Sequence, residues 1–94
     1  MVFRASTISH QEIKVGVKDL PLDSGQHVSD VFVKSFGWVC TYGKNHFVLT
    51  HPQKSQNLFI SIPDHKHVDR KLLKAELRKA EITVKEFCEA YDGG

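Results

Sequence analysis

The chain has 94 residues, of which 40% are hydrophobic and 26% are charged, and this length gives one domain with one modest core. The formal net charge is only +2 at pH 7, which by itself says little about the partners of the protein. No apolar run approaches the roughly 20 residues of a membrane span, and the N-terminus lacks the core of a signal peptide. We therefore expect a cytoplasmic protein with no membrane partner.

Residues 1–22 carry little pattern, and we treat them as an N-terminal extension of unknown role. A brief alternation from Glu12 to Val17 could add an edge strand. The first predicted helix follows, because Ser24 is a suitable N-cap, apolar residues recur at helical spacing, and Gly37 can stop the helix.

Three strands are predicted next, at residues 38–42, 46–51 and 58–62, separated by a turn at residues 43–45 and a polar loop at 52–57. Asp69 can then cap a second helix, whose Leu73 and Leu77 lie on one apolar stripe. Thr83 and Glu86 have capping-box spacing for a short final helix. The order predicts an α+β domain over residues 23–94, with a three-stranded antiparallel sheet.

His46 begins the second predicted strand, directly after the polar turn. Because side chains alternate along a strand, Phe47 and Leu49 should face the helices and His46 should face the open side of the sheet. An imidazole there can exchange a proton near neutral pH, which makes His46 a candidate catalytic residue. The alternative interpretation is an exposed turn histidine without a role.

Basic residues gather from Lys66 to Lys79, where only Asp69 and Glu76 oppose them. Such a helix can bind phosphate, although an ordinary solvated helix face is an equally simple interpretation. The two cysteines match no metal or redox spacing, and His65 with His67 supplies too few ligands for a closed metal site. We therefore expect no metal and no cofactor.

Several short motifs follow one another in a consistent order from Asp23 to Tyr91. They are Ser24-Gly25, Lys34-Ser35-Phe36-Gly37-Trp38, Lys44-Asn45-His46, His51-Pro52, Ile62-Pro63-Asp64-His65, and the segment from Leu72 to Phe87. In this order they resemble the HicA toxin family, the mRNA interferases of type II toxin–antitoxin systems. The chain departs from the family where Lys44 and Asn45 replace the usual Gly-Ser before the histidine, and Gly43 could relax this altered turn. Lys71 and Glu81 also stand where the family often has glycine.

The resemblance implies a fold like that of double-stranded-RNA-binding domains, α-β-β-β-α with the helices on one face of the sheet. It implies a metal-independent endoribonuclease that cleaves messenger RNA through His46, and a HicB-like antitoxin protein as its inhibitor. The candidate RNA-binding residues are Lys44 and Asn45 beside the histidine, and Lys71, Lys74 and Arg78 on the second helix. A non-catalytic RNA-binding or protein-interaction module on the same fold remains the alternative, since fold does not dictate function.

Overall fold

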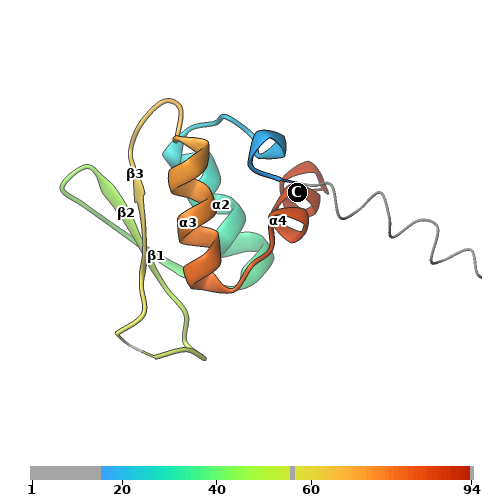
Figure 1. The fold of residues 1–94 in the computed structure, drawn as a ribbon. Coiled ribbons are helices and arrows are strands. Elements are labelled where there is room, and N and C mark those ends of the chain that lie inside the picture. The colour runs from blue at the N-terminus through green and yellow to red at the C-terminus, as the bar shows by residue number, and fades with distance from the viewer. Residues whose placement is uncertain (1–15, 56, 94) are drawn as a thin grey trace, which may run out of the picture.

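The computed structural model describes residues 16–55 and 57–93. Its elements in chain order are the short 3-10 helix η1 (Val17–Asp19), the helix α2 (Gly25–Phe36), the strands β1 (Val39–Gly43), β2 (His46–Thr50) and β3 (Ile60–Pro63), and the helices α3 (Arg70–Ala80) and α4 (Val84–Gly93) (Figure 1). This order confirms the predicted α-β-β-β-α arrangement with a short final helix. Of the edge strand expected from Glu12 to Val17, residues 12–15 lie outside the described residues, and Val17 begins η1 instead of extending a strand.

The helix ends form where the sequence predicts them. The Ser24 hydroxyl accepts a hydrogen bond from the His27 N–H at 3.1 Å, and a left-handed Gly37 ends α2. The Asp69 carboxylate caps α3 by accepting from the Leu72 N–H at 3.0 Å. A capping box before α4 is also present, because Thr83 and Glu86 each accept a hydrogen bond from the backbone N–H of the other.

The sheet is antiparallel, with β2 between β1 and β3. Gly43 pairs with His46, so only Lys44 and Asn45 connect β1 to β2, and both have positive φ (50° and 67°). A two-residue connection with both φ values positive is the type I′ turn, whose twist matches the strands it joins. The left-handed conformation therefore falls on Lys44 and Asn45 themselves, and Gly43, which we expected to relax the turn, lies within β1.

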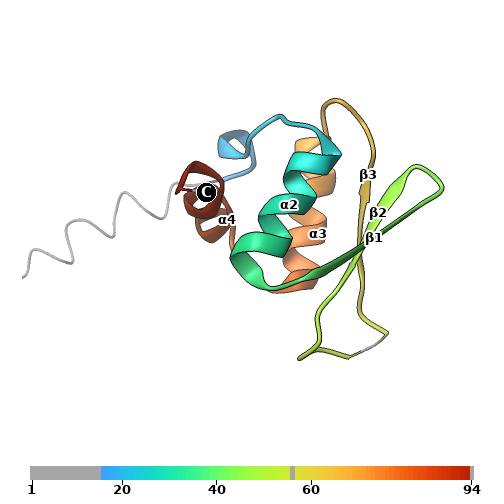
Figure 2. The same ribbon diagram turned by 180° about the vertical axis from the view of Figure 1, so that it is seen from behind.

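The helices α2 and α3 cover one face of the sheet, and α4 lies against α2 on the side away from the strands (Figures 1 and 2). Leu49, Ile60 and Ile62 point into this helix-covered face and are fully buried, whereas His46 and Thr50 on the other face are exposed. This alternation confirms the predicted orientation of β2. None of the helices formed by the described residues is both long enough and apolar enough for a membrane crossing.

The folded unit extends past the expected boundary at residue 23. Leu20 is 1% exposed and belongs to the core, and its carbonyl accepts a hydrogen bond from Arg70 Nε at 2.7 Å. The segment around η1 is thus held against α3 by one buried side chain and one hydrogen bond to a guanidinium group.

Candidate functional site

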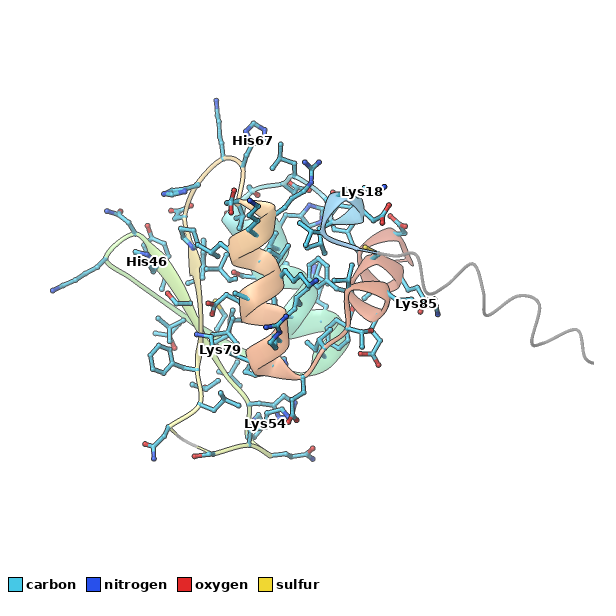
Figure 3. All side chains as sticks on the ribbon, in the orientation of Figure 1. Lys18, His46, Lys54, His67, Lys79 and Lys85 are labelled. Atoms are coloured by element: carbon cyan, nitrogen blue, oxygen red, sulfur yellow. The ribbon has the colours of Figure 1, made fainter. Side chains whose placement is uncertain are left out.

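His46 lies at the first position of β2, on the sheet face opposite α2 and α3 (Figure 3). Its Nδ1 lies 3.1 Å from the Lys44 carbonyl oxygen. A carbonyl only accepts hydrogen bonds, so this contact favours the neutral tautomer with the proton on Nδ1. The lone pair of that tautomer is on Nε2, on the side of the ring away from the Lys44 carbonyl. His46 is therefore oriented by its own turn and keeps one ring nitrogen available for a substrate.

The strand residues that share the open face with His46 are uncharged. Its direct neighbours across the sheet are Gly43 on β1 and Pro63 on β3, and Thr41, Val48 and Ser61 complete the same face by their register. The nearest cation along the chain is Lys44, in the turn itself and exposed. The structure thus brings together three of the predicted site residues, Lys44, Asn45 and His46, at the tip of one hairpin.

This hairpin tip is held in place by two contacts with the chain after β3. The Asn45 carbonyl accepts a hydrogen bond from the Asp64 N–H at 2.9 Å, and the Tyr42 hydroxyl donates to the Asp64 carboxylate at 2.8 Å. The bond to Asp64 raises the pKa of the Tyr42 hydroxyl. Tyr42 pairs with Phe47, so its side chain leaves the opposite face from His46, and the Tyr42–Asp64 pair supports the turn without reaching the imidazole. No local pattern in the sequence predicts this pair, because the two residues lie 22 positions apart.

His51, the other histidine of the predicted motifs near β2, has a different environment. Its Nε2 lies 3.0 Å from the Phe36 carbonyl, its Nδ1 accepts from the Gln53 N–H at 3.1 Å, and its ring meets Trp38 edge-on. Both ring nitrogens are occupied, which fixes the proton on Nε2 and leaves no lone pair for chemistry. His51 joins the end of α2 to the end of β2, and it is a structural residue.

Lys71, Lys74 and Arg78 lie on one side of α3, as their spacing predicts (i, i+3, i+7). With Val17 and Ala75 they line a shallow hollow on the surface beside η1. Figures 1 and 3 show the β1–β2 hairpin projecting on the other side of the molecule from η1 and α4. The structure therefore separates the predicted RNA-binding residues into two groups, one at the hairpin tip and one on the η1 side of α3.

A second cluster of polar side chains joins α2 to α4. The Asp23 carboxylate accepts hydrogen bonds from the Tyr91 hydroxyl at 2.6 Å, the Ser24 N–H at 2.6 Å and His27 Nδ1 at 2.7 Å. The pKa of Asp23 is lowered, mainly by the Tyr91 hydrogen bond and next by the Ser24 N–H. His27 and Tyr91 also line a cavity of about 190 Å³ between the two helices. The sequence spacing of Asp23 and His27 could have indicated their i, i+4 contact, but Tyr91 comes close only through tertiary folding.

No group of three or more His, Cys, Asp or Glu side chains within residues 16–55 and 57–93 is arranged to hold a metal ion. The chemistry that these residues offer is a proton acceptor at His46 Nε2 and one exposed cation, Lys44, two residues earlier in the turn. Such a pair suits a reaction in which a hydroxyl loses a proton near a negatively charged group. Comparison of the chain with protein-family models, with curated proteins and with solved structures gave no match. The resemblance to the HicA family therefore rests on the motifs of the sequence.

Proposed function

We propose that the protein is an endoribonuclease that cleaves RNA at the tip of the β1–β2 hairpin, with His46 as the catalytic residue. The observation that supports this most directly is the His46 ring, which is exposed and whose Nδ1 is held by the Lys44 carbonyl at 3.1 Å. A ring that is already oriented, with a free Nε2, is a pre-arranged general base. The match of the motifs around this turn to the HicA family gives the substrate class, messenger RNA.

The proposed reaction uses the RNA's own 2′-hydroxyl as the nucleophile. His46 Nε2 removes the 2′-hydroxyl proton, the 2′-oxygen attacks the adjacent phosphorus, and the bond from phosphorus to the 5′-oxygen breaks. The products are a 2′,3′-cyclic phosphate and a free 5′-hydroxyl, whose proton comes from water or from a protonated imidazole. Lys44 is two residues before His46 in the exposed turn, and its ammonium group can stabilise the negative charge that builds up on the phosphate oxygens. Asn45 can orient the phosphate through its side-chain amide.

Single-stranded RNA suits the open sheet face better than a duplex. The face around His46 carries Thr41, Val48 and Ser61, which are small, and Lys44 is the cation of the turn. A flexible single strand can bring its 2′-hydroxyl and phosphate to a single histidine, whereas a duplex holds them in a fixed groove. We propose the α3 residues Lys71, Lys74 and Arg78 as a second contact for the RNA backbone, reached by nucleotides beyond the cleaved bond.

A protein that cleaves messenger RNA needs an inhibitor, and we propose a HicB-like antitoxin. The exposed hairpin tip, with Lys44 and His46 at its surface, fits a partner that supplies acidic side chains and covers the ring. Cytoplasmic location and a role in stress response follow from the same family resemblance and belong to this proposal.

The test replaces His46 by alanine and measures cleavage of a single-stranded RNA. Removal of a general acid–base group lowers the rate by about a hundred- to ten-thousand-fold, and we expect the fold to be unaffected because the side chain is exposed. Thr50→Ala is the matched control, since Thr50 is exposed on the same face of the same strand. A folded His46→Ala variant with full activity would overturn the mechanism. Inhibition of wild-type cleavage by a chelator, with activity restored by a metal ion, would do the same.

The contribution of α3 is tested separately by the salt dependence of RNA binding. Removing one phosphate interaction reduces the slope of log K against log salt by about 0.7 for a single strand. If Lys71, Lys74 and Arg78 touch the backbone, replacing all three by alanine should flatten the slope by about two units. Replacing Lys18, Lys34 and Lys85, which lie on other helical segments, is the charge-matched control. An unchanged slope in the α3 variant would remove α3 from the binding surface.

A further inference from the structure

The two edges of the sheet differ in how their backbone groups are used. In a hairpin closed by two residues, the N–H and C=O groups of each flanking residue bond to those of the other. Gly43 and His46 are this flanking pair, so the backbone groups of Gly43 point toward β2. Backbone groups alternate in direction along each strand. It follows that Cys40 and Tyr42 point their N–H and C=O groups away from β2. On β3 the residues that point away from β2 are Ser61 and Pro63.

The β3 edge is closed by side chains of the protein itself. The Ser61 N–H donates to the Glu76 carboxylate at 3.0 Å, and Lys79 holds that carboxylate at 3.0 Å. Pro63 has no N–H, and its carbonyl lies so close to Gly25 that a Cβ there would collide with it. No donor on β3 is left for another strand, which is a common way to protect a sheet edge.

The β1 edge is open. Among residues 16–55 and 57–93, no hydrogen bond from a side chain or loop reaches the outward N–H and C=O groups of Cys40 and Tyr42. The strand sequence Val-Cys-Thr-Tyr-Gly contains no charged residue, and Val39 and Tyr42 are 54% and 53% exposed. An exposed, uncharged edge of this kind is a template for another strand.

We propose that β1 pairs antiparallel with β1 of a second copy of this chain, about a two-fold axis at Thr41. In this register the two outward residues, Cys40 and Tyr42, lie opposite Tyr42 and Cys40 of the second copy, and their free backbone groups exchange hydrogen bonds. Centring on Thr41 is the register that overlaps the whole of both strands and leaves no outward group unpaired.

The charges near β1 favour the same register. Counting outward from Thr41, Lys44 lies opposite Trp38 of the second copy. Trp38 follows Gly37, the residue that ends α2. The carboxyl end of a helix carries a partial negative charge, which attracts the Lys44 ammonium of the other copy. Lys34 in the last turn of α2 and the bond from His51 to the Phe36 carbonyl reduce this attraction. β1 itself has no charged side chain. Burial raises the pKa of the Cys40 thiol, and Asp30 of α2 lies close enough to raise it further. The pairing joins two sheets into one and leaves both His46 side chains on its uncovered face. The two tests below measure association of the chains and do not depend on RNA cleavage.

Disulfide trapping tests the register. In a background of Cys40→Ser and Cys88→Ser, Thr41→Cys places two thiols directly opposite each other at a pair without backbone hydrogen bonds, where Cβ atoms are about 4.5–5.5 Å apart. Mild oxidation should convert most of the protein to a cross-linked dimer. Thr50→Cys in the same background is the control, because Thr50 is equally exposed on the same face but lies on β2. Cross-linking that is absent at position 41, or equal at both positions, would overturn the pairing.

The mass in solution gives an independent measurement. The chain has a mass of 10.7 kDa, and we expect sedimentation equilibrium at about 100 μM to report twice this value, since that concentration fills a dimer of micromolar affinity. Thr41→Lys places two ammonium groups at the axis and should weaken the dimer by tenfold or more. Thr50→Lys carries the same charge away from the axis and should remain dimeric. A monomeric wild type, or a Thr41→Lys variant that dimerises as well as Thr50→Lys, would contradict the proposal.

Discussion

One histidine begins β2 and another directly follows it, and the two residues are used in opposite ways. His46 at the hairpin end is exposed, and within residues 16–55 and 57–93 only its Nδ1 has a hydrogen-bond partner, the carbonyl two residues earlier. His51 at the other end is half-buried, with Nε2 on the Phe36 carbonyl, Nδ1 on the Gln53 N–H and Trp38 against the ring. The same side chain is thus a free proton acceptor at one end and part of the packing at the other.

This contrast indicates that the number of free ring nitrogens, more than the presence of a histidine, marks a candidate catalytic residue. A ring with both nitrogens satisfied would have to break a hydrogen bond before it could accept a proton. A ring held through one nitrogen has already lost most of its rotational freedom and is still reactive at the other. Both histidines belong to motifs that resemble the HicA family, so the motif alone does not separate them.

The greatest change in stability should come from His51. His51→Ala removes the partner of the Phe36 carbonyl and the ring that packs on Trp38, and we expect a loss of about 1–3 kcal/mol in the free energy of unfolding. His46→Ala should change the same quantity by less than about 0.5 kcal/mol, as exposed substitutions usually do. Urea denaturation of both variants measures this contrast. Equal stability losses in His51→Ala and His46→Ala would contradict the conclusion that His51 is part of the packing and His46 is not.

The tyrosine–aspartate pairs give a similar contrast at a smaller scale. Tyr91→Phe removes the hydrogen bond to Asp23 that joins α4 to the start of α2, and we expect a loss of about 1 kcal/mol at neutral pH after allowance for solvent screening. Tyr42→Phe, at the hairpin end, removes an exposed bond of the same kind to Asp64 and should cost less. The two variants form a matched pair for thermal unfolding. If Tyr42→Phe lowers the melting temperature more than Tyr91→Phe does, the Tyr42–Asp64 bond contributes more to stability than the Tyr91–Asp23 bond, contrary to this prediction.

The Tyr91 effect should depend on pH in a defined direction. The pKa of Asp23 is lower in the folded protein than in the unfolded chain, where it is about 4. The stability that ionised Asp23 contributes is therefore complete above about pH 4, and it is lost as the pH falls through the pKa of Asp23 in the folded protein. The wild type and Tyr91→Phe should therefore differ most in stability above about pH 4 and converge at more acid pH. If the difference in stability between the wild type and Tyr91→Phe grows on acidification, the ionised Asp23 carboxylate is not the group through which Tyr91 stabilises the fold.

A still smaller change is expected in the turn that carries His46. Lys44 has a φ of 50°, which costs a side chain with a Cβ more than it costs glycine. Relief of roughly 1–2 kcal/mol of left-handed strain in Lys44→Gly should exceed the roughly 0.4–1 kcal/mol of unfolded-state entropy that glycine adds, so we expect a net gain of up to about 1 kcal/mol. The same change should weaken the proposed RNA binding, because the cation of the turn is lost. Asn45→Gly should gain less, since asparagine tolerates the left-handed region. A Lys44→Gly variant that binds RNA with unchanged affinity would remove Lys44 from the site.

Features that depend on near neighbours along the chain could be predicted from the amino-acid order alone. The caps at Ser24 and Asp69, the capping box before α4 and the alternation that exposes His46 were all predicted, because each depends on residues a few positions apart. The order of the elements followed from the same local patterns.

Features that join distant segments came from tertiary folding and could not be predicted. The hydrogen bonds of His51 to the end of α2, of Tyr91 to Asp23, and of Glu76 to the β3 edge connect residues 15 to 68 positions apart. Folding also packed Leu20 into the core and placed Lys71, Lys74 and Arg78 beside Val17 of η1. No periodicity records such contacts, because they depend on how the helices lie on the sheet and not on the spacing within any one element.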